Sequence, residues 1–262
     1  MRRKIIRPMR QKVIRHVTDT GESGYQINQS LVLNNGDSSD LTRTPTSSNG
    51  RQVFTFSIWF KRVDITSYQT FYGTGLGTNL STYDAARFTN TNKIELFGSD
   101  AAAFSLSTIN AFDSLTDWYH VVISADTTQA TASDRINITV NGVAQTLTGS
   151  YPSLNYNLSY NGATIPQYIA ARRLPGGASR FYIGNACEIY NCTGVAYDAT
   201  EFGEFIEGVW MPKAPDVVYG DNGFYLNFAD SSDIGNDLSG ENNDFTPNNL
   251  TPANVVSDSP TS

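Results

Sequence analysis

Charged residues, cysteines, histidines and long apolar runs are all scarce in this chain of 262 residues. Charged side chains make up 16% of it, against about 25% in ordinary globular proteins. Because no apolar run is long enough for a membrane helix, and none follows the basic start as a secretory signal would, neither a membrane span nor export is indicated. With only two histidines, neither a metal cluster nor a Ser/His/Asp triad can be assembled.

The two cysteines, Cys187 and Cys192, fall in one expected strand. Their odd spacing predicts that they point to opposite faces, so a disulfide between them is not expected. The chain is therefore expected to be made in a reducing cytoplasm.

Aromatic residues are plentiful, with 14 Tyr and 14 Phe. Together with many Asn, Ser and Thr residues, they favour strands and polar loops over surface helices. An all-β chain of this length often folds as one unit. We expect a basic arm over residues 1–24, a sandwich domain over 25–245 and a polar C-terminal tail over 246–262.

Period-two alternation marks the clearest strands. Residues 53–61, 135–140 and 223–228 alternate apolar and polar side chains, and Asn141-Gly142 after the second is a strong hairpin signal. Further strands are expected at 30–33, 69–72, 93–97, 104–107, 117–125, 143–147 and 180–192, and a helical turn at 198–202. The pattern predicts a two-sheet antiparallel jelly-roll sandwich. Its predicted core comprises Phe54, Phe56, Ile58, Phe60, Ile136, Ile138, Val140, Phe224, Leu226 and Phe228.

The arm concentrates positive charge. Its seven cations, with no acidic residue among them, are Arg2, Arg3, Lys4, Arg7, Arg10, Lys12 and Arg15. Residues 16–262 then carry 11 basic and 25 acidic residues, a net charge of −14. Met9, Val13 and Val17 recur every four residues, which suits a short helix, and a disordered tail is the alternative. Nucleic acid is a poor partner, because the arm has no interleaved aromatics and the acidic body would repel phosphate.

Several sequence blocks resemble the laminin-G-like and concanavalin-A-like lectin jelly rolls found in tailed-phage virion proteins. They include Leu41-Thr42-Arg43-Thr44-Pro45, Thr55 to Arg62, Asp117 to Val122, and Gly223-Phe224-Tyr225-Leu226. The resemblance extends over roughly residues 25–260. It implies a non-enzymatic virion structural protein on the particle surface, as a fibre component or a capsid decoration protein. Relatives often continue into further modules.

Three functions follow from this resemblance. In the first, the arm docks on an acidic groove of other virion proteins, and the domain, a homo-oligomer, faces outward. In the alternative, the domain is a carbohydrate-binding adhesin that recognises host-surface glycan. A glycan-cleaving enzyme, the third, is disfavoured, because such enzymes need two carboxylates on one strand face and Glu188 is the only acid in its strand.

Candidate ligand-binding residues are aromatic. Trp59 lies on the strand face opposite the phenylalanines, as a binding platform or as a side chain covered by a loop or a neighbouring subunit. Tyr151, Tyr156 and Tyr160 fall in a long polar loop that could form a glycan- or protein-binding rim, with packing in a solvent-exposed loop as the alternative. His120 is expected to be a packed, hydrogen-bonded histidine, with a ligand contact as the alternative.

A cluster of acidic residues near the C-terminus suggests one cofactor. Asp233, Asp237 and Asp244 could supply oxygen ligands to Ca²⁺ in a flexible loop. Asx-type turns explain the same residues without a metal. No other cofactor is expected.

Overall fold

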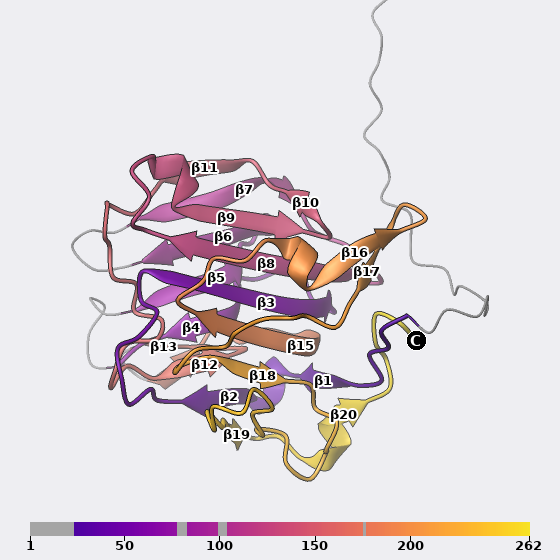
Figure 1. Ribbon diagram of the computed structural model, residues 1–262. Coiled ribbons are helices and arrows are strands. Elements are labelled where there is room, and N and C mark those ends of the chain that lie inside the picture. The colour runs from indigo at the N-terminus through magenta and orange to yellow at the C-terminus, as the bar shows by residue number, and fades with distance from the viewer. Residues whose placement is uncertain (1–23, 78–82, 99–103, 175–176) are drawn as a thin grey trace, which may run out of the picture.

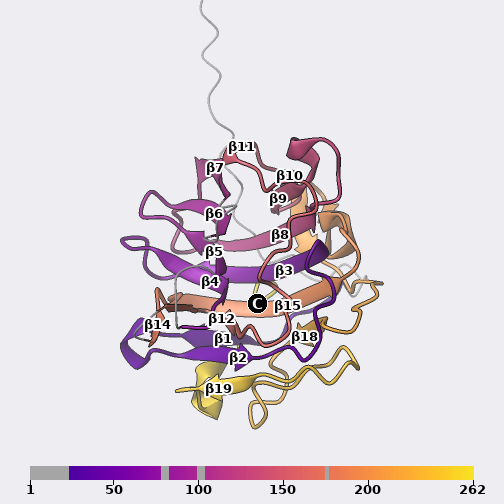
Figure 2. The same ribbon diagram turned by 90° about the vertical axis from the view of Figure 1, so that its left-hand side faces the viewer.

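The computed structural model describes residues 24–77, 83–98, 104–174 and 177–262. It is an all-β sandwich in which two large antiparallel sheets face one another, as Figure 1 and, turned by 90°, Figure 2 show. The predicted fold class is therefore confirmed. No helix in the described segments is long and apolar enough to cross a membrane.

Sheet A is the layer in front in Figure 1. In spatial order its strands are β10 (Val143–Ala144), β9 (Ile136–Val140), β8 (Trp118–Asp126), β3 (Val53–Arg62), β15 (Gly184–Thr193), β1 (Ser30–Leu33) and β20 (Val255–Val256), with β18 (Phe224–Leu226) also paired to β15.

Sheet B is the second layer. Its strands are β11 (Leu147–Ser150), β7 (Ser105–Ala111), β6 (Lys93–Gly98), β5 (Asp84–Phe88), β4 (Gln69–Thr74), β12 (Gln167–Ile169), β2 (Asp40–Arg43) and β19 (Thr246–Asn248).

Two small hairpins and four short 3₁₀ turns complete the described chain. The hairpins are β13 (Arg172–Leu174) with β14 (Gly177–Ser179), and β16 (Gly203–Ile206) with β17 (Val209–Pro212). The turns are η1 (Asn35–Asp37), η2 (Ala132–Asp134), η3 (Ala199–Glu201) and η4 (Pro252–Asn254).

The core lies between the two sheets and is rich in aromatic rings. All ten residues of the predicted core are buried in this one cluster, which confirms the alternation used to find them. The ring of Phe60 meets that of Phe88 edge-on at 4.9 Å between centroids and that of Phe71 at 5.7 Å. Such pairs add to the stability gained from buried area alone.

The turn after β9 also agrees with the sequence. Asn141 and Gly142 both have positive φ, 48° and 72°, as a type I′ hairpin turn requires. A Cβ on Gly142 would lie 2.3 Å from the Trp210 ring. Glycine is therefore needed here for close packing as well as for φ.

A bulge in β15 changes the faces on which its side chains lie. The register against β3 shifts between Cys187 and Tyr190, and Glu188 within the shift has φ of 48°. Two residues of β15 there face one of β3, which resets the alternation. Cys187 and Cys192 consequently lie in the same cluster as Trp59, outside sheet A, and both thiols are free. The prediction of opposite faces was wrong, because period two does not hold across a bulge.

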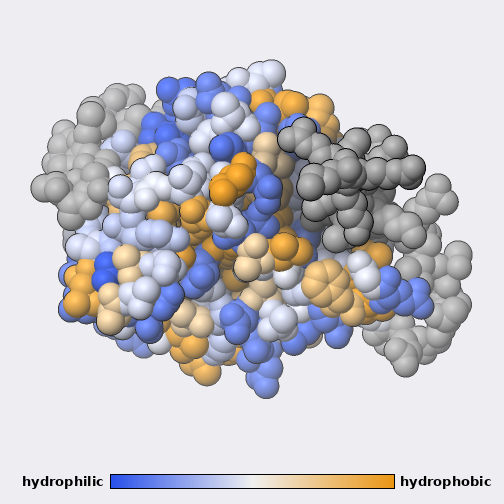
Figure 3. All heavy atoms as spheres, turned by 90° about the horizontal axis from the view of Figure 1, so that it is seen from above, coloured by the Kyte–Doolittle hydropathy of each residue, from blue (hydrophilic) through white to orange (hydrophobic). Residues whose placement is uncertain are grey.

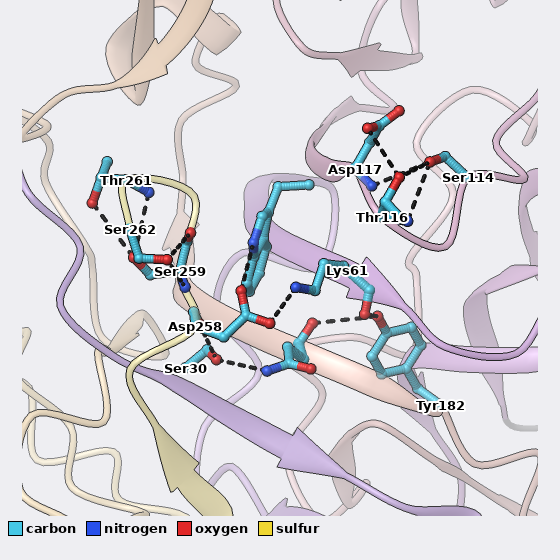
Figure 4. Close-up of polar contacts among 12 residues, drawn as sticks. Ser30, Lys61, Ser114, Thr116, Asp117, Tyr182, Asp258, Ser259, Thr261 and Ser262 are labelled. Carbon is cyan, nitrogen blue, oxygen red and sulfur yellow. Dashed lines mark hydrogen bonds and ion pairs between the residues drawn. The ribbon is translucent and has the colours of Figure 1, made fainter. Parts of the chain in front are cut away.

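Residues 246–262 are part of the sandwich and not a separate tail. Strand β19 pairs with β2, and β20 pairs with β1. Near the C-terminus, Asp258 forms an ion pair with Lys61, and its carboxylate accepts a hydrogen bond from Trp118 Nε1 at 3.4 Å (Figure 4). The Ser30 hydroxyl donates a hydrogen bond to the backbone oxygen of Asp258 at 2.5 Å. The expected boundary at 245 is therefore corrected. Polar composition concealed strands that pair with existing edges.

The hairpin β16–β17 covers the outer face of sheet A (Figure 1). His120 on β8 joins it to the sheet, because its ring stacks on Trp59 at 4.7 Å and its Nδ1 accepts a hydrogen bond from Trp210 Nε1 at 3.0 Å. The other ring nitrogen, Nε2, lies 2.8 Å from the Ser57 hydroxyl. Since an indole N–H only donates, Nδ1 must be the unprotonated nitrogen, and Nε2 carries the proton and donates to Ser57. His120 is thus a packed, hydrogen-bonded histidine, as predicted, and not a base that could activate Ser57.

The end of the sandwich at which β10 and β11 lie has a mixed surface. In the part that the structure describes, apolar groups are scattered between hydrophilic ones (Figure 3). Isolated apolar groups of this kind are usual on a protein surface. The predicted homo-oligomer stays a prediction.

Replacing a core aromatic should destabilise the fold strongly. Phe60→Ala leaves a cavity between the sheets, and we expect it to lower the free energy of unfolding by roughly 3–5 kcal/mol in chemical denaturation. Val218→Ala, at a side chain that is 67% exposed, is the control and should change stability little. A small effect of Phe60→Ala would contradict the two-sheet core.

Acid should weaken the fold through His120. Burial lowers the pKa of His120 to about 3, whereas an unfolded histidine titrates near 6.5. Between these values the unfolded chain binds a proton that the folded chain does not, so stability falls as pH falls from about 6.5, by at most about 1.4 kcal/mol per pH unit. His120→Gln should remove this contribution. Denaturation at pH 7 and pH 4 should then show a smaller loss in the variant than in the wild type, and equal losses would contradict a neutral buried His120.

Candidate functional site

The outer face of sheet B carries a polar hollow. Alternation along β2 points Leu41 into the core and Asp40 and Thr42 outward. On the neighbouring β12, Ile169 points inward and Tyr168 outward. The hairpin β13–β14 and the segment that follows it rise beside these strands and form one wall.

This hollow has a volume of about 620 Å³. Pockets for small ligands generally occupy 300–1,000 Å³. The residues that line it include Asp40, Thr42, Asn248, Tyr168, Phe181 and Arg173.

Three polar side chains at the edge of the hollow orient one another. Asn248 on β19 lies opposite Asp40 in the strand register. Its Nδ2 donates to Asp40 Oδ1 at 2.7 Å and lies 3.0 Å from the Thr42 hydroxyl oxygen, and the Thr42 hydroxyl donates to the same Asp40 oxygen at 2.7 Å. Held in this way, a carboxylate, a hydroxyl and an amide present donors and acceptors at fixed positions, which a hydroxyl-rich ligand requires.

Aromatic side chains lie beside this polar set. Tyr168 and Phe181 are 4% and 8% exposed and pack with Ala171 in a small cluster. Burial raises the pKa of Tyr168, and the charge of Arg173 partly opposes that rise. Arg173 itself is exposed. The hollow thus combines ring edges, a cation and the polar set within one surface.

Trp59 is not an open binding platform. Its side chain is 1% exposed and lies beneath His120 and the β16–β17 hairpin. It lies on the face opposite the core phenylalanines, as expected. It is covered by another part of the same chain, so the expectation of a covered side chain fits better than that of a binding platform. Its role in the described structure is packing.

The loop tyrosines fill the end of the core. Tyr160 is fully buried, stacks on Tyr72 at 4.4 Å and donates its hydroxyl proton to the Tyr72 carbonyl at 2.9 Å. Tyr156 packs against Phe104, and Tyr151 packs partly buried on the same core cluster. A solvent-facing glycan rim is therefore not formed by these residues. Instead, the rings of these tyrosines add buried aromatic area to the core cluster.

Asp233, Asp237 and Asp244 are explained by turns. Asp237 Oδ1 accepts the backbone N–H groups of Tyr225 and Ser239 at 2.8 and 2.9 Å, and its Oδ2 accepts the Ser239 hydroxyl at 2.7 Å. Asp244 accepts the N–H of Asp237 at 2.9 Å. Within the described residues no group of three or more acidic, histidine or cysteine side chains is placed to hold a metal ion. The geometry does not assemble the predicted calcium site.

Glu188 is enclosed by tyrosines. Its carboxylate accepts hydrogen bonds from Tyr25 at 2.8 Å, Tyr225 at 2.9 Å and Tyr190. Burial raises its pKa, while these three hydrogen bonds act in the opposite direction. The group lies outside sheet A under the N-terminal segment, so it anchors residues 25–27 and not a ligand.

The seven cations of the arm, at positions 2–15, lie outside the described residues. Docking of the arm and the virion-surface location therefore stay predictions. The absence of catalysis also stays a prediction.

Sequence reasoning missed the residues of the hollow. Thr42 lies in the segment 41–45 that resembles known jelly rolls, and Asp40 directly precedes that segment. Asn248 lies in the expected C-terminal tail. A strand of three residues gives almost no periodic signal. The one available hint was the alternation of polar Asp40, apolar Leu41 and polar Thr42.

No known family model matches this chain, and no curated protein matches it in sequence. Among solved structures, it is similar to a candidate carbohydrate-binding protein from Bacteroides ovatus, at 16% identity and a TM-score of 0.57, over 91% of this chain and 62% of that protein. A SAP-like pentraxin from Limulus polyphemus is 12% identical, over 65% of this chain and 78% of that protein, with a TM-score of 0.47. A domain of tailspike protein 2 from bacteriophage CBA120 is 15% identical, over 66% of this chain and 26% of that protein, with a TM-score of 0.46.

The likeness to the Bacteroides ovatus protein shows the fold alone. This chain spans about three fifths of that protein's length, 62%.

Removing the Asp237 carboxylate should destabilise the loop whether or not calcium is present. Asp237→Ala leaves several backbone N–H groups without their acceptor, and we expect a loss of about 1–3 kcal/mol in unfolding free energy. Asp233→Ala, at an exposed position, is the matched control. Thermal melts of the wild type should agree in excess calcium and in chelator. A chelator-induced shift that Asp233→Ala abolishes would restore the calcium site.

Proposed function

We propose that this chain is a carbohydrate-binding domain whose ligand lies in the hollow on the outer face of sheet B. The observation that carries the proposal is the mutually oriented set of Asp40, Thr42 and Asn248 beside the rings of Tyr168 and Phe181. Sugars present hydroxyl groups to such donors and acceptors and C–H edges to aromatic carbon.

The position of the hollow supports the proposal. Sheet A is covered on its outer side by the β16–β17 hairpin, whereas β2, β12 and β19 leave a polar surface open on sheet B. The only acidic side chain that lines the described hollow is Asp40. Because glycosidic bond hydrolysis ordinarily uses two carboxyl groups, we propose binding without cleavage.

The virion role expected from the sequence is compatible with this function. A carbohydrate-binding domain tethered to a particle by a basic arm would attach that particle to host-surface glycan. The adhesin function, first stated as the alternative, is thus the one that we propose.

The direct test is a glycan array probed with the full chain, followed by calorimetry on the strongest sugar. Asn248→Ala removes the amide that orients both neighbours, and we expect it to weaken binding roughly tenfold, the effect of losing about one to two hydrogen bonds. Asn137→Ala, an exposed asparagine in a strand of sheet A, is the matched control and should bind normally.

Two results would overturn the proposal. If no sugar on the array binds, or if Asn248→Ala and Asn137→Ala bind alike, the hollow is not a glycan site. Release of cleaved sugar during calorimetry would support the glycan-cleaving alternative instead.

A further inference from the structure

A row of stacked arginines and aromatic rings lies on the outer face of sheet B, beside the hollow. Alternation on β5 and β6 puts Arg87 and Phe97 on that face, since Phe88 and Leu96 point into the core. We call this row the arginine ladder. Its members, in order of contact, are Arg180, Tyr68, Arg87, Phe97, Arg172 and Tyr83.

Cations and rings alternate along the ladder. The Arg87 guanidinium lies between two rings, 4.5 Å from the centroid of Tyr68 and 4.1 Å from that of Phe97. Arg172 follows, 5.6 Å from Phe97 and 5.2 Å from Tyr83. Rings on the faces of a guanidinium leave its N–H groups directed outward in the guanidinium plane, where they can bind an oxyanion.

Positive charge on the ladder is only partly balanced by ion pairs with described side chains. Arg87 pairs with Glu95 at 2.7 Å, and the ion pairs of the described segments include no partner for Arg172 or Arg180. Arg172 is 6% exposed, and its Nε has no hydrogen-bond partner among the described residues. Burial lowers the pKa of Arg172 and the charges of Arg87 and Arg180 lower it further, whereas the charge interaction and hydrogen bond with Tyr83 raise it. An uncompensated buried cation is costly.

Packing alone accounts for only part of this arrangement. Stacking on rings explains how the β13–β14 hairpin is held on the sheet. It does not explain why three like charges gather on a body whose net charge is −14, nor why Arg180 holds a positive φ of 59°, which is uncommon for a long side chain. Strain and uncompensated charge that persist together on a surface are typical of binding sites.

The ladder adjoins the hollow at Arg180, which directly precedes Phe181, a residue that lines the hollow. Arg172 and Arg173 are neighbours on β13, so their side chains leave opposite faces of the hairpin, and of the two Arg173 alone lines the hollow. A ligand that occupies the hollow would therefore reach the ladder first at Arg180.

We propose that the ligand is an anionic glycan, with acidic groups of its sugars held at the guanidinium edges of Arg180 and Arg172 along the ladder and a neighbouring sugar in the hollow. This inference rests on the proposed carbohydrate-binding function and names its ligand class. Carboxylate and sulfate esters share the oxyanion that a guanidinium binds in bidentate fashion.

The test compares three polymers by calorimetry with the full chain: polygalacturonate, heparin and uncharged dextran. Arg180→Asn removes an exposed cation and places at that position a residue that adopts positive φ readily. Lys213→Gln, after β17 on the opposite side of the sandwich, changes the net charge equally and is the control. Arg172→Lys keeps the charge but loses the planar fork.

We expect polygalacturonate or heparin to bind more tightly than dextran, and the stronger of the two identifies carboxylate or sulfate as the recognised group. Arg180→Asn and Arg172→Lys should each weaken that binding about tenfold, as loss of a charge-assisted hydrogen bond implies, while Lys213→Gln leaves it unchanged. Higher salt should weaken binding of the charged polymer alone.

The outcomes separate this inference from the proposed function. Equal affinity for charged and uncharged sugars, or binding of the acidic polymer that Arg180→Asn and Lys213→Gln change alike, would overturn the anionic ligand and leave carbohydrate binding intact. Failure to bind any sugar on the array, with Asn248→Ala indistinguishable from wild type, would overturn the proposed function itself.

Discussion

The contact between His120 and Trp210 sets which face of the sandwich is free. His120 receives a hydrogen bond from Trp210 and stacks on Trp59, so the β16–β17 hairpin is held against the outside of sheet A. With that face buried, β3 is covered on both sides, and its run of buried residues reflects this. The hollow and the arginine ladder both lie on the other sheet, where the β13–β14 hairpin borders the hollow and leaves it open.

The fold could be predicted wherever one face of a strand is apolar. The apolar positions of β3, which are Phe54, Phe56, Ile58 and Phe60, predicted the strand and its part of the core. The dipeptide Asn141-Gly142 predicted the hairpin that follows β9. Prediction failed where tertiary pairing replaces local pattern. Strands β19 and β20 are held by partner edges, and the bulge at Glu188 turns both cysteines to one face; neither follows from a local period.

The site was much less predictable than the fold, for a physical reason. Conspicuous aromatic residues, such as Trp59 and Tyr160, were chosen as ligand contacts and proved to be buried, because large rings stabilise most when enclosed. The hollow instead joins Asp40 and Asn248, which are 208 residues apart in sequence. The ladder likewise brings together four separate segments. Only the register of sheet B, which no local pattern specifies, places these side chains together.

Hydrogen exchange measured with and without the best-binding oligosaccharide from the array tests the account most directly. If the ligand lies on sheet B, exchange should slow in β2, β12 and β19, and for an acidic sugar also in β5 and β13, while β16–β17 stays unchanged. Ligand-induced protection confined to the β16–β17 hairpin or to the loop 230–244, with β2 and β19 unaffected, would contradict the central claim.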